Sequence, residues 1–325
     1  MEYTTLGETG MTVSRLCLGC MSFATDGNDW ADWVLEADES RRIIDRAIDL
    51  GINFFDTANM YSRGGSEVVL GRALAEYDPD WPVVATKVYH EMDPNNPNAS
   101  GLSRKAIEQE LANSLDRLQL DAVDLYQIHR WDERTPIAET MAALDDAVRR
   151  GQVRYLGASS MRTHQFAEAI HTSESLGLDR FVSMQNHYNL AYREEEREML
   201  PFCRKRGIGV IPWSPLGRGY LTRPHREMDA TDRAAEDQKM FRLPYREGGG
   251  REINERVEEL ADQQDVTMAQ LALAWVLHQD WVDAPIIGTT SVDHLEQAVA
   301  ALEISLSDSD LAYLAEPYEP VRVAD

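Results

Sequence analysis

Short apolar runs alternate with amphipathic stretches along the chain. These runs lack the polar alternation of a half-exposed strand, so they predict parallel strands buried on both faces. We expect strands at Ser14–Leu18, Asn53–Asp56, Val83–Thr86, Val123–Gln127, Tyr155–Ala158, Val182–Gln185, Gly209–Pro212 and Ala284–Ile287. The stretches between them repeat apolar residues at helical spacing. We expect helices at Asp38–Leu50, Ser66–Tyr77, Ser103–Leu120, Pro136–Arg150, Thr163–Ser175, Glu194–Lys205, Arg251–Ala261, Met268–His278 and Asp293–Leu302.

Glycine follows several of the predicted helices, at Gly51, Gly151, Gly177 and Gly207. A glycine at this place is typical of a helix end that leads directly into the next strand. Eight strand-helix repeats without a linker predict one closed (β/α)8 TIM barrel, an α/β fold forming a single domain over residues 1–325. The alternative is an open doubly wound sheet, but no G-x-G-x-x-G follows the first predicted strand, where a Rossmann fold needs it.

Three long segments follow predicted strands at the end of the barrel where active sites lie. The first, Ser22–Ala37, contains Trp30 and Trp33, and the second is Tyr89–Gly101. The third and longest runs over residues 214–250. Loops of this length are usually functional lids, and the alternative for the third is a solvated excursion.

Composition restricts the classes of partner. Hydrophobic residues make up 43% of the chain, which predicts a globular core, and the formal net charge of −24 disfavours nucleic acid. No apolar run is long enough to span a membrane, and the first residues lack a secretory pattern. Three cysteines are too few for a disulfide framework. We therefore expect a cytoplasmic protein without a membrane or nucleic-acid partner, and a monomer as the simplest assembly.

The basic residues are almost all arginine, because only four of the 32 are lysines. Abundant acids with scarce lysine indicate a halophile-like surface adapted to high salt, where screening reduces the repulsion between carboxylates. The alternative is an acidic protein from ordinary salt.

Four polar residues stand where the predicted strands end. Asp56, Lys87 and His129 lie at or just after the ends of three strands, and Tyr61 follows Asp56 by five residues. Because the carboxyl ends of barrel strands meet at one mouth, these side chains could converge there. Each alone has an ordinary structural explanation, and only the combination indicates a site.

The combination suits the reduction of a carbonyl group. The alkoxide formed needs a proton, and a free tyrosine with a pKa of about 10 holds its proton too tightly near neutrality. We expect the Lys87 ammonium to lower the pKa of Tyr61, and Asp56 to keep Lys87 charged and oriented. His129 would hydrogen-bond the substrate oxygen or Tyr61.

These motifs resemble those of the aldo-keto reductase superfamily. The matching segments are FFDTA at 54–58 with Tyr61, Ser66-Glu67, Thr86-Lys87, QIHR at 127–130, VSRLCLG at 13–19 and PIIGT at 285–289. Residues 184–190 and 192–198 are similar to the bacterial reductase linked to 1-deoxyxylulose 5-phosphate formation, and more distantly to potassium-channel β subunits. The resemblance implies that Asp56, Tyr61, Lys87 and His129 are a catalytic tetrad, with Tyr61 as the proton donor.

The resemblance also implies a nicotinamide cofactor, usually NADP(H), extended across the barrel mouth. Ser159, Ser160 and Gln185 would hold the carboxamide, and Trp213 would stack on the nicotinamide ring. The residues expected along the pyrophosphate are Ser214, Pro215, Leu216, Gly217, Arg218 and Gly219, with Arg233 folding over it. Those expected around the adenosine are Gly288, Thr289, Thr290, His294 and Gln297. Thr290 stands where many relatives carry a basic residue, so NAD stays an alternative.

Four aromatic residues are candidates for contact with the substrate. They are Trp30, Trp33, Tyr89 and Trp131, since the carboxyl-terminal loop that shapes the pocket in many relatives is short here. The alternative is that they are core or rim aromatics.

The predicted function is an oxidoreductase that transfers hydride between NADP(H) and the carbonyl/alcohol pair of a small aldehyde, ketone or sugar. One alternative is a cofactor-bound, redox-sensing regulatory subunit with little turnover. Another, a metal-dependent sugar isomerase, lacks the clustered ligands that it would need. Cys17 and Cys20 form a C-x-x-C pattern within a predicted strand, which favours buried packing over a redox pair or a zinc site. We therefore predict no metal.

Overall fold

Eight parallel strands form a closed barrel in the computed structural model, which describes residues 1–28, 30–227 and 243–323. Their bounds are β3 (Cys17–Gly19), β4 (Phe54–Asp56), β5 (Val83–Val88), β6 (Val123–Ile128), β7 (Val153–Ser159), β8 (Phe181–Gln185), β9 (Gly209–Val210) and β10 (Ile286–Gly288). The sheet order is β10, β3, β4, β5, β6, β7, β8, β9. The backbone N–H of Ile286 donates to the Pro212 carbonyl at 2.9 Å, which joins β10 to the chain after β9. The predicted barrel is confirmed.

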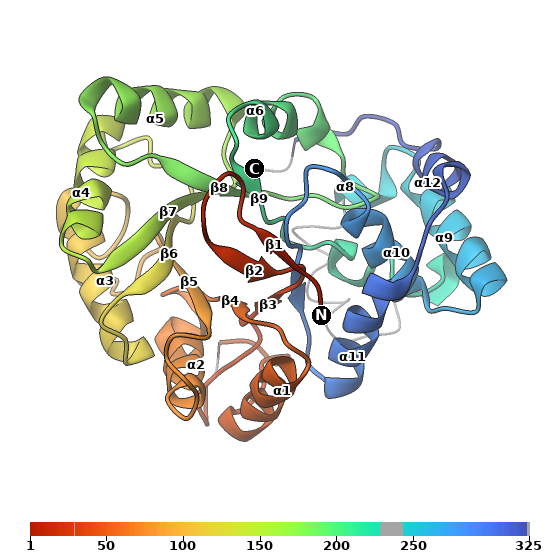
Figure 1. The fold of residues 1–325 in the computed structure, drawn as a ribbon, viewed down its shortest axis with the longest axis horizontal. Coiled ribbons are helices and arrows are strands. Elements are labelled where there is room, and N and C mark those ends of the chain that lie inside the picture. Colours follow the sequence, from red (N-terminus) through yellow and green to blue (C-terminus); the bar gives the residue numbers. More distant parts are fainter. Residues whose placement is uncertain (29, 228–242, 324–325) are drawn as a thin grey trace.

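Helices surround the barrel, as Figure 1 shows. They are α1 (Ala37–Asp49), α2 (Gly65–Leu74), α3 (Arg104–Leu118), α4 (Ile137–Arg149), α5 (Thr163–Leu176), α6 (Met199–Lys205), α8 (Leu243–Arg246), α9 (Gly250–Gln264), α10 (Met268–Leu277), α11 (Val292–Ala300) and α12 (Asp308–Ala315). Gly51 after α1 and Gly177 after α5 have φ of +85° and +66°, the left-handed helix ends that the sequence predicts. Within the described ranges, no helix combines the length and the apolar character needed to cross a membrane.

Successive strand residues face opposite sides of the barrel wall. Phe54 packs in the cluster inside the barrel, whereas Phe55 packs in the larger cluster between barrel and helices. In β6, Leu125 likewise packs inside the barrel and Tyr126 packs between barrel and helices. Both faces are therefore buried, which explains why the strands read as continuous apolar runs.

A hairpin covers the amino-terminal end of the barrel (Figure 1), formed by β1 (Tyr3–Thr5) and β2 (Thr12–Ser14). Leu6 and Val13 join the inner cluster, so the hairpin closes the barrel floor. The predicted start of the first barrel strand at Ser14 is wrong, because the strand begins at Cys17. The Ser14 hydroxyl donates to the Leu16 carbonyl at 2.6 Å, and this local bond turns the chain between β2 and β3.

One helix prediction also needs correction, and one carboxyl-terminal helix is absent from the predictions. The helix expected over Glu194–Lys205 divides into a 3-10 turn, η2 (Glu194–Glu196), and α6, which begins at Met199. Pro201 lacks a backbone N–H and is tolerated only in the first turn of a helix, so α6 cannot start earlier. Helix α12 is not predicted, although Ser307 and Asp310 form a capping box at its start.

The long segment after β9 contains short helical elements in its described part. These are η3 (Gly217–Gly219), η4 (His225–Glu227) and α8. The cofactor contact expected of Arg233 falls outside the described residues.

Helices α2 and α3 approach each other closely at Gly71. A Cβ atom built on Gly71 would lie 2.4 Å from the backbone carbonyl oxygen of Leu118 and 2.7 Å from its Cα. Backbone atoms cannot move aside as a flexible side chain can, so this contact requires glycine.

We predict that Gly71→Ala lowers the free energy of unfolding by about 1–2 kcal/mol, because overpacking outweighs the gain in helix propensity. The measurement is urea denaturation of both proteins. The matched control is Gly10→Ala, since a Cβ at Gly10 meets no atom within 4 Å. Equal stability changes in the two variants would contradict the close-packing assignment.

Candidate active site

Lys87 lies at the centre of a hydrogen-bonded cluster at the carboxyl end of the barrel. Its Nζ donates to Asp56 Oδ1 at 2.5 Å, to the Thr57 carbonyl at 2.8 Å and to the Tyr61 hydroxyl at 3.3 Å. The Lys87 side chain is 0% exposed and that of Asp56 is 3% exposed. The structure thus brings together three of the four predicted catalytic residues in direct contact.

Two glutamines hold the other carboxylate oxygen of Asp56. Gln127 and Gln185 donate to Oδ2 through their Nε2 atoms, at 2.9 Å and 2.8 Å. Gln127 has no role in the sequence prediction, although a polar residue within an apolar strand is a signal for one. Asp56 therefore accepts three hydrogen bonds and is fixed from β5, β6 and β8 together.

Tyr61 begins the 3-10 turn η1 (Tyr61–Gly64), soon after β4. Ser62 and Arg63 have φ of 49° and 53°, and the Ser62 hydroxyl donates to the Phe23 carbonyl at 2.9 Å. The turn is thereby tied to the loop after β3. The Lys87 Nζ lies 4.8 Å from the centroid of the Tyr61 ring.

Burial and charge act in opposite directions on this pair. Burial lowers the pKa of Lys87, but attraction by Asp56 and Tyr61 outweighs burial and raises it overall. Burial raises the pKa of Tyr61, and Lys87 counters this increase without overcoming it. Lys87 therefore acts on the phenol in the expected direction, but burial outweighs it and the pKa of Tyr61 is raised overall. Tyr61 stays protonated at neutral pH.

His129 follows β6 directly and completes the cluster. Its ring lies edge-on to the Tyr61 ring, with centroids 5.7 Å apart, and edge-on to His90 at 4.7 Å. Burial, together with the charge of Lys87, holds the pKa of His129 well below its usual 6.5. Burial and Arg130 lower the pKa of His90 to about 4. Both rings are therefore neutral near pH 7.

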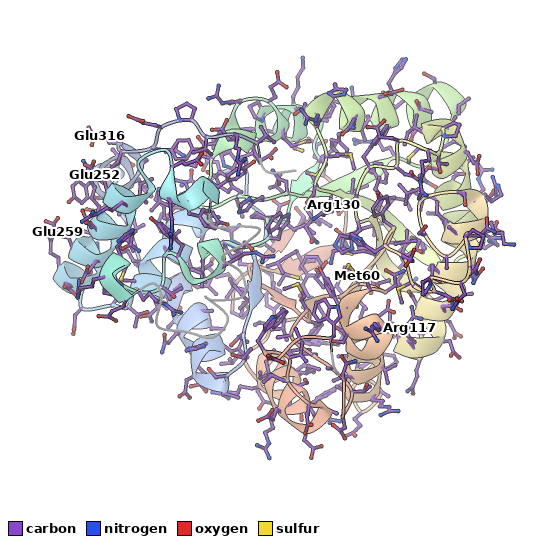
Figure 2. The ribbon with its side chains drawn as sticks, turned by 180° about the vertical axis from the view of Figure 1, so that it is seen from behind. Met60, Arg117, Arg130, Glu252, Glu259 and Glu316 are labelled. Carbon is purple, nitrogen blue, oxygen red and sulfur yellow. The ribbon has the colours of Figure 1, made fainter. Side chains whose placement is uncertain are left out.

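A cavity of about 1110 Å³ extends from this cluster across the barrel mouth. Asp56, Tyr61 and His129 line one end of it. Fourteen of the predicted cofactor residues also line it, namely Ser159, Gln185, Trp213, Ser214, Pro215, Leu216, Gly217, Arg218, Gly219, Gly288, Thr289, Thr290, His294 and Gln297. Figure 2 views this side of the molecule, with Met60 and Arg130 near the middle of the barrel.

Trp213 is held against a stack of aromatic rings. Its ring is parallel to that of His187, with centroids 4.2 Å apart, and His187 stacks on Tyr192 at 4.1 Å. The Tyr245 hydroxyl lies 2.5 Å from His187 Nε2. Trp213 Nε1 donates to the Ser160 hydroxyl at 2.9 Å, which gives Ser160 a place beside the cavity. The sequence prediction contains no role for His187.

Left-handed backbone occurs at three non-glycine residues around Trp213. Ser160, Ser214 and Arg218 have φ of 47°, 54° and 55°. Such conformations are disfavoured for residues with a Cβ and tend to gather at functional sites. Their position agrees with a wall shaped for a ligand.

The four aromatic candidates for substrate contact divide into two pairs. Trp30 and Trp33 line the cavity, 5.5 Å apart, and Trp30 lies 6.4 Å from the Tyr61 ring. Tyr89 and Trp131 pack against the hydrophobic core and are not among the described residues that line the cavity. Substrate contact by this second pair stays a prediction.

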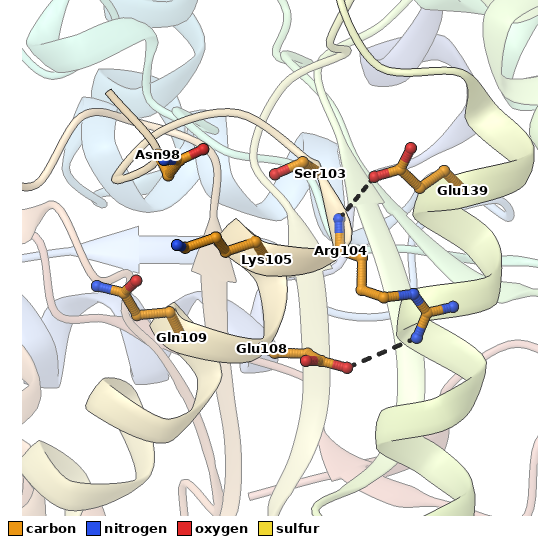
Figure 3. Close-up of a pocket in the computed structure, with 7 residues that line it drawn as sticks. All are labelled: Asn98, Ser103, Arg104, Lys105, Glu108, Gln109 and Glu139. Atoms are coloured by element: carbon orange, nitrogen blue, oxygen red, sulfur yellow. Dashed lines mark hydrogen bonds and ion pairs between the residues drawn. The ribbon is translucent and has the colours of Figure 1, made fainter. Parts of the chain in front are cut away.

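A separate hollow lies outside the barrel at the start of α3 (Figure 3). Its lining contains Lys105, Arg104 and Glu139, but no predicted site residue. The Arg104 backbone N–H donates to Glu139 at 3.0 Å, and its guanidinium pairs with Glu108 at 3.5 Å. Arg104 also pairs with Asp146, so it is engaged within the protein, and the barrel mouth is the stronger candidate.

Cys17 and Cys20 are fully buried free thiols, in agreement with a packing role. Burial raises the pKa of both thiols well above 9.0. In the part of the chain that the structure describes, no three His, Cys, Asp or Glu side chains group to hold a metal ion.

A second buried carboxylate, that of Glu67, is bonded to the strand that carries Lys87. Glu67 in α2 is 0% exposed and accepts hydrogen bonds from the Thr86 hydroxyl at 2.5 Å and from Arg117 Nε at 2.6 Å. Thr86 directly precedes Lys87 in β5, so this network links two helices to the strand that carries the lysine. The sequence prediction uses Glu67 only as part of a motif.

The chain matches known proteins over nearly its full length. The model described as "Aldo/keto reductase family" matches residues 15–319. A Schizosaccharomyces pombe protein provisionally named aryl-alcohol dehydrogenase is 44% identical, over 99% of this chain and 97% of the relative. A Saccharomyces cerevisiae protein with the same provisional name is 40% identical, over 98% and 97%. The versiconal hemiacetal acetate reductase of Aspergillus parasiticus is 39% identical, over 99% and 98%.

We predict that Arg117→Met lowers the free energy of unfolding by about 3 kcal/mol or more, because it leaves Glu67 buried without its counter-charge. Chemical denaturation measures this loss. The control is Arg251→Met, which removes an exposed pair with Glu255 and should cost much less. A similar small loss in both variants would show that the Glu67 network contributes little.

Proposed function

The chain belongs to the aldo/keto reductase family and is an NAD(P)H-dependent oxidoreductase, and we propose that it uses NADP(H) to interconvert a small carbonyl compound and its alcohol. The observation that carries this proposal is the position of Lys87. One ammonium lies within hydrogen-bond distance of both the Asp56 carboxylate and the Tyr61 hydroxyl, and these two residues line the cavity.

The cavity suits an extended dinucleotide. Trp213 presents a flat ring whose other face is backed by His187, a surface on which a nicotinamide can stack. Gly288 and Thr289 lead into the amino-terminal end of α11, where backbone N–H groups and the helix dipole favour phosphate. Arg218 and Arg223 also line the cavity. When bound, the cofactor supplies the hydride for carbonyl reduction.

Tyr61 acts as the proton donor in this proposal. Burial raises its pKa, so the hydroxyl is protonated at neutral pH, and that proton passes to the alkoxide oxygen that forms as the carbonyl is reduced, which is a stronger base than the phenolate. The phenolate left behind is stabilised by the Lys87 ammonium 3.3 Å away, whose charge Asp56 secures. The neutral His129 ring orients the carbonyl oxygen.

The walls near Tyr61 favour a substrate with an apolar or aromatic body. Trp30, Trp33 and Met60 line this end of the cavity. The names of the fungal relatives also point to aryl alcohols and aldehydes as candidates, beside the ketones and sugars that the sequence leaves open. The narrower likeness to the bacterial reductase and to channel β subunits, the cytoplasmic location, the single domain and the monomeric state stay predictions.

We predict that Tyr61→Phe lowers kcat for NADPH-dependent reduction of benzaldehyde at least 100-fold, because general acid catalysis contributes roughly 10²–10⁴-fold. Steady-state absorbance measures the rate, and fluorescence titration should show that NADPH still binds. Tyr313→Phe, at a surface residue bonded to Glu259, is the control and should retain full activity.

The outcome separates the candidate functions. Near-normal turnover by Tyr61→Phe would contradict the role of Tyr61. Binding of NADPH by the unmodified protein, without multiple turnovers over an aldehyde and ketose panel, would instead favour the regulatory-subunit alternative. A parallel titration with NADH tests the preference for NADP(H), which Thr290 leaves open.

The pKa shifts predict opposite pH dependences for the two directions. Reduction needs a proton on Tyr61, which stays bound below the raised pKa of the phenol, so kcat/KM should be flat from pH 6 to 9. Alcohol oxidation needs the phenolate, so its rate should rise with pH over the same range. The neutral His129 should add no change near pH 6.5. A fall in reduction below pH 7 that disappears in His129→Gln would contradict this assignment.

A further inference from the structure

Arg130 is a cation at the reacting end of the cavity. It follows His129 directly, and it lines the cavity together with Tyr61 and His90. Figure 2 labels it near the middle of the barrel mouth. The guanidinium is held in place by a hydrogen bond of 2.8 Å from Nη1 to the His129 carbonyl.

This guanidinium makes no ion pair with any carboxylate of residues 1–28, 30–227 and 243–323. Within the described residues Arg15 also makes no ion pair, but its guanidinium donates to three backbone carbonyls. Arg117 and Arg193, which are also largely buried, are both paired with glutamates. One of the five guanidinium N–H groups is used by the His129 carbonyl. Donors are therefore left for a ligand.

We propose that Arg130 binds an anionic group of the substrate, a carboxylate or a phosphate, so that the enzyme prefers anionic aldehydes to neutral ones. This inference rests on the proposed reductase function, because it describes the substrate of the same site. A planar guanidinium binds either oxyanion through two parallel N–H bonds.

The position of Arg130 favours the substrate over the cofactor as the source of the anion. The cofactor phosphates are expected along residues 214–219 and at the start of α11, where Arg218 and Arg223 line the cavity. Arg130 instead adjoins His129 and Tyr61, where the carbonyl group would react. The charge of Arg130 also acts on Tyr61, in the direction that lowers its pKa.

The other walls define the rest of the substrate. Trp30 and Trp33 form an aromatic side of the same end of the cavity. The carboxylate of Asp56 is already engaged by Lys87, Gln127 and Gln185, so it does not compete for Arg130. An aromatic aldehyde with a carboxylate on the ring therefore combines both features.

The test compares aldehydes of similar shape and different charge. One pair is 4-carboxybenzaldehyde and 4-methylbenzaldehyde, and a second pair, glyceraldehyde 3-phosphate and glyceraldehyde, tests phosphate. The variants are Arg130→Met, which removes the charge, and Arg130→Lys, which retains it. Arg251→Met changes the net charge equally at an exposed site and is the control.

We expect the unmodified enzyme to have a higher kcat/KM for the charged member of at least one pair. Arg130→Met should lower the ratio of charged to neutral kcat/KM about 10- to 100-fold, as the loss of a charge-assisted hydrogen bond implies. Arg130→Lys should lie between the two, and Arg251→Met should leave the ratio unchanged. Whichever pair responds identifies carboxylate or phosphate as the preferred anion.

A second readout does not depend on turnover. Calorimetry with the NADP⁺-loaded protein gives Kd for 4-carboxybenzaldehyde and for glyceraldehyde 3-phosphate, and Arg130→Met should weaken at least one of them by a similar factor. Absence of any charge preference in kcat/KM, or a preference and affinities that survive Arg130→Met, would overturn the inference. Reduction of neutral aldehydes alone would support the proposed function and refute the role of Arg130.

Discussion

The buried ion pair between Lys87 and Asp56 is the interaction on which the site depends. Two charges removed from water are stable only when their remaining hydrogen-bonding groups are satisfied. Gln127 and Gln185 complete the carboxylate, and the Thr57 carbonyl and the Tyr61 hydroxyl complete the ammonium. These partners come from several strands and the loop after β4, so the polar layer requires a closed barrel. The apolar layer beneath it, with Phe54 and Leu125, excludes water from the same interior.

The wall beyond the ion pair is ordered by a different set of contacts. Trp213 is fixed by the stack on His187 and by its bond to Ser160, while Asn189 donates to the Ser214 carbonyl at 3.0 Å. Left-handed backbone at Ser160 and Ser214 costs about 1–2 kcal/mol per residue, which these contacts offset. The described part of this wall is thus held by contacts within the protein itself.

The sequence predicts the barrel well because its strands are buried on both faces and its helices end in glycine. It also predicts the convergence of Asp56, Tyr61 and Lys87, since strand ends in a barrel meet at one mouth. It does not predict His187 or the Glu67 network, because their roles depend on neighbours far away in the chain. The sequence also does not predict the net rise in the pKa of Tyr61, because this rise depends on how deeply the phenol is buried. Spacing reveals the lysine, whereas the degree of burial emerges only in three dimensions.

The choice of lysine at position 87 follows from this geometry. The chain uses arginine for nearly all its positive charges, yet the buried cation at the barrel centre is a lysine. An ammonium has three donors on one small atom, and Lys87 directs them to Asp56, the Thr57 carbonyl and Tyr61. A guanidinium is planar and wider, so it would lose one of these bonds or displace the phenol from the cavity wall. Arg130 lies in the more open barrel mouth, where several guanidinium N–H groups can donate to a ligand. Lys87 and Arg130 therefore differ in shape because their partners differ. The partners of Lys87 belong to the protein, whereas the proposed partner of Arg130 is a ligand.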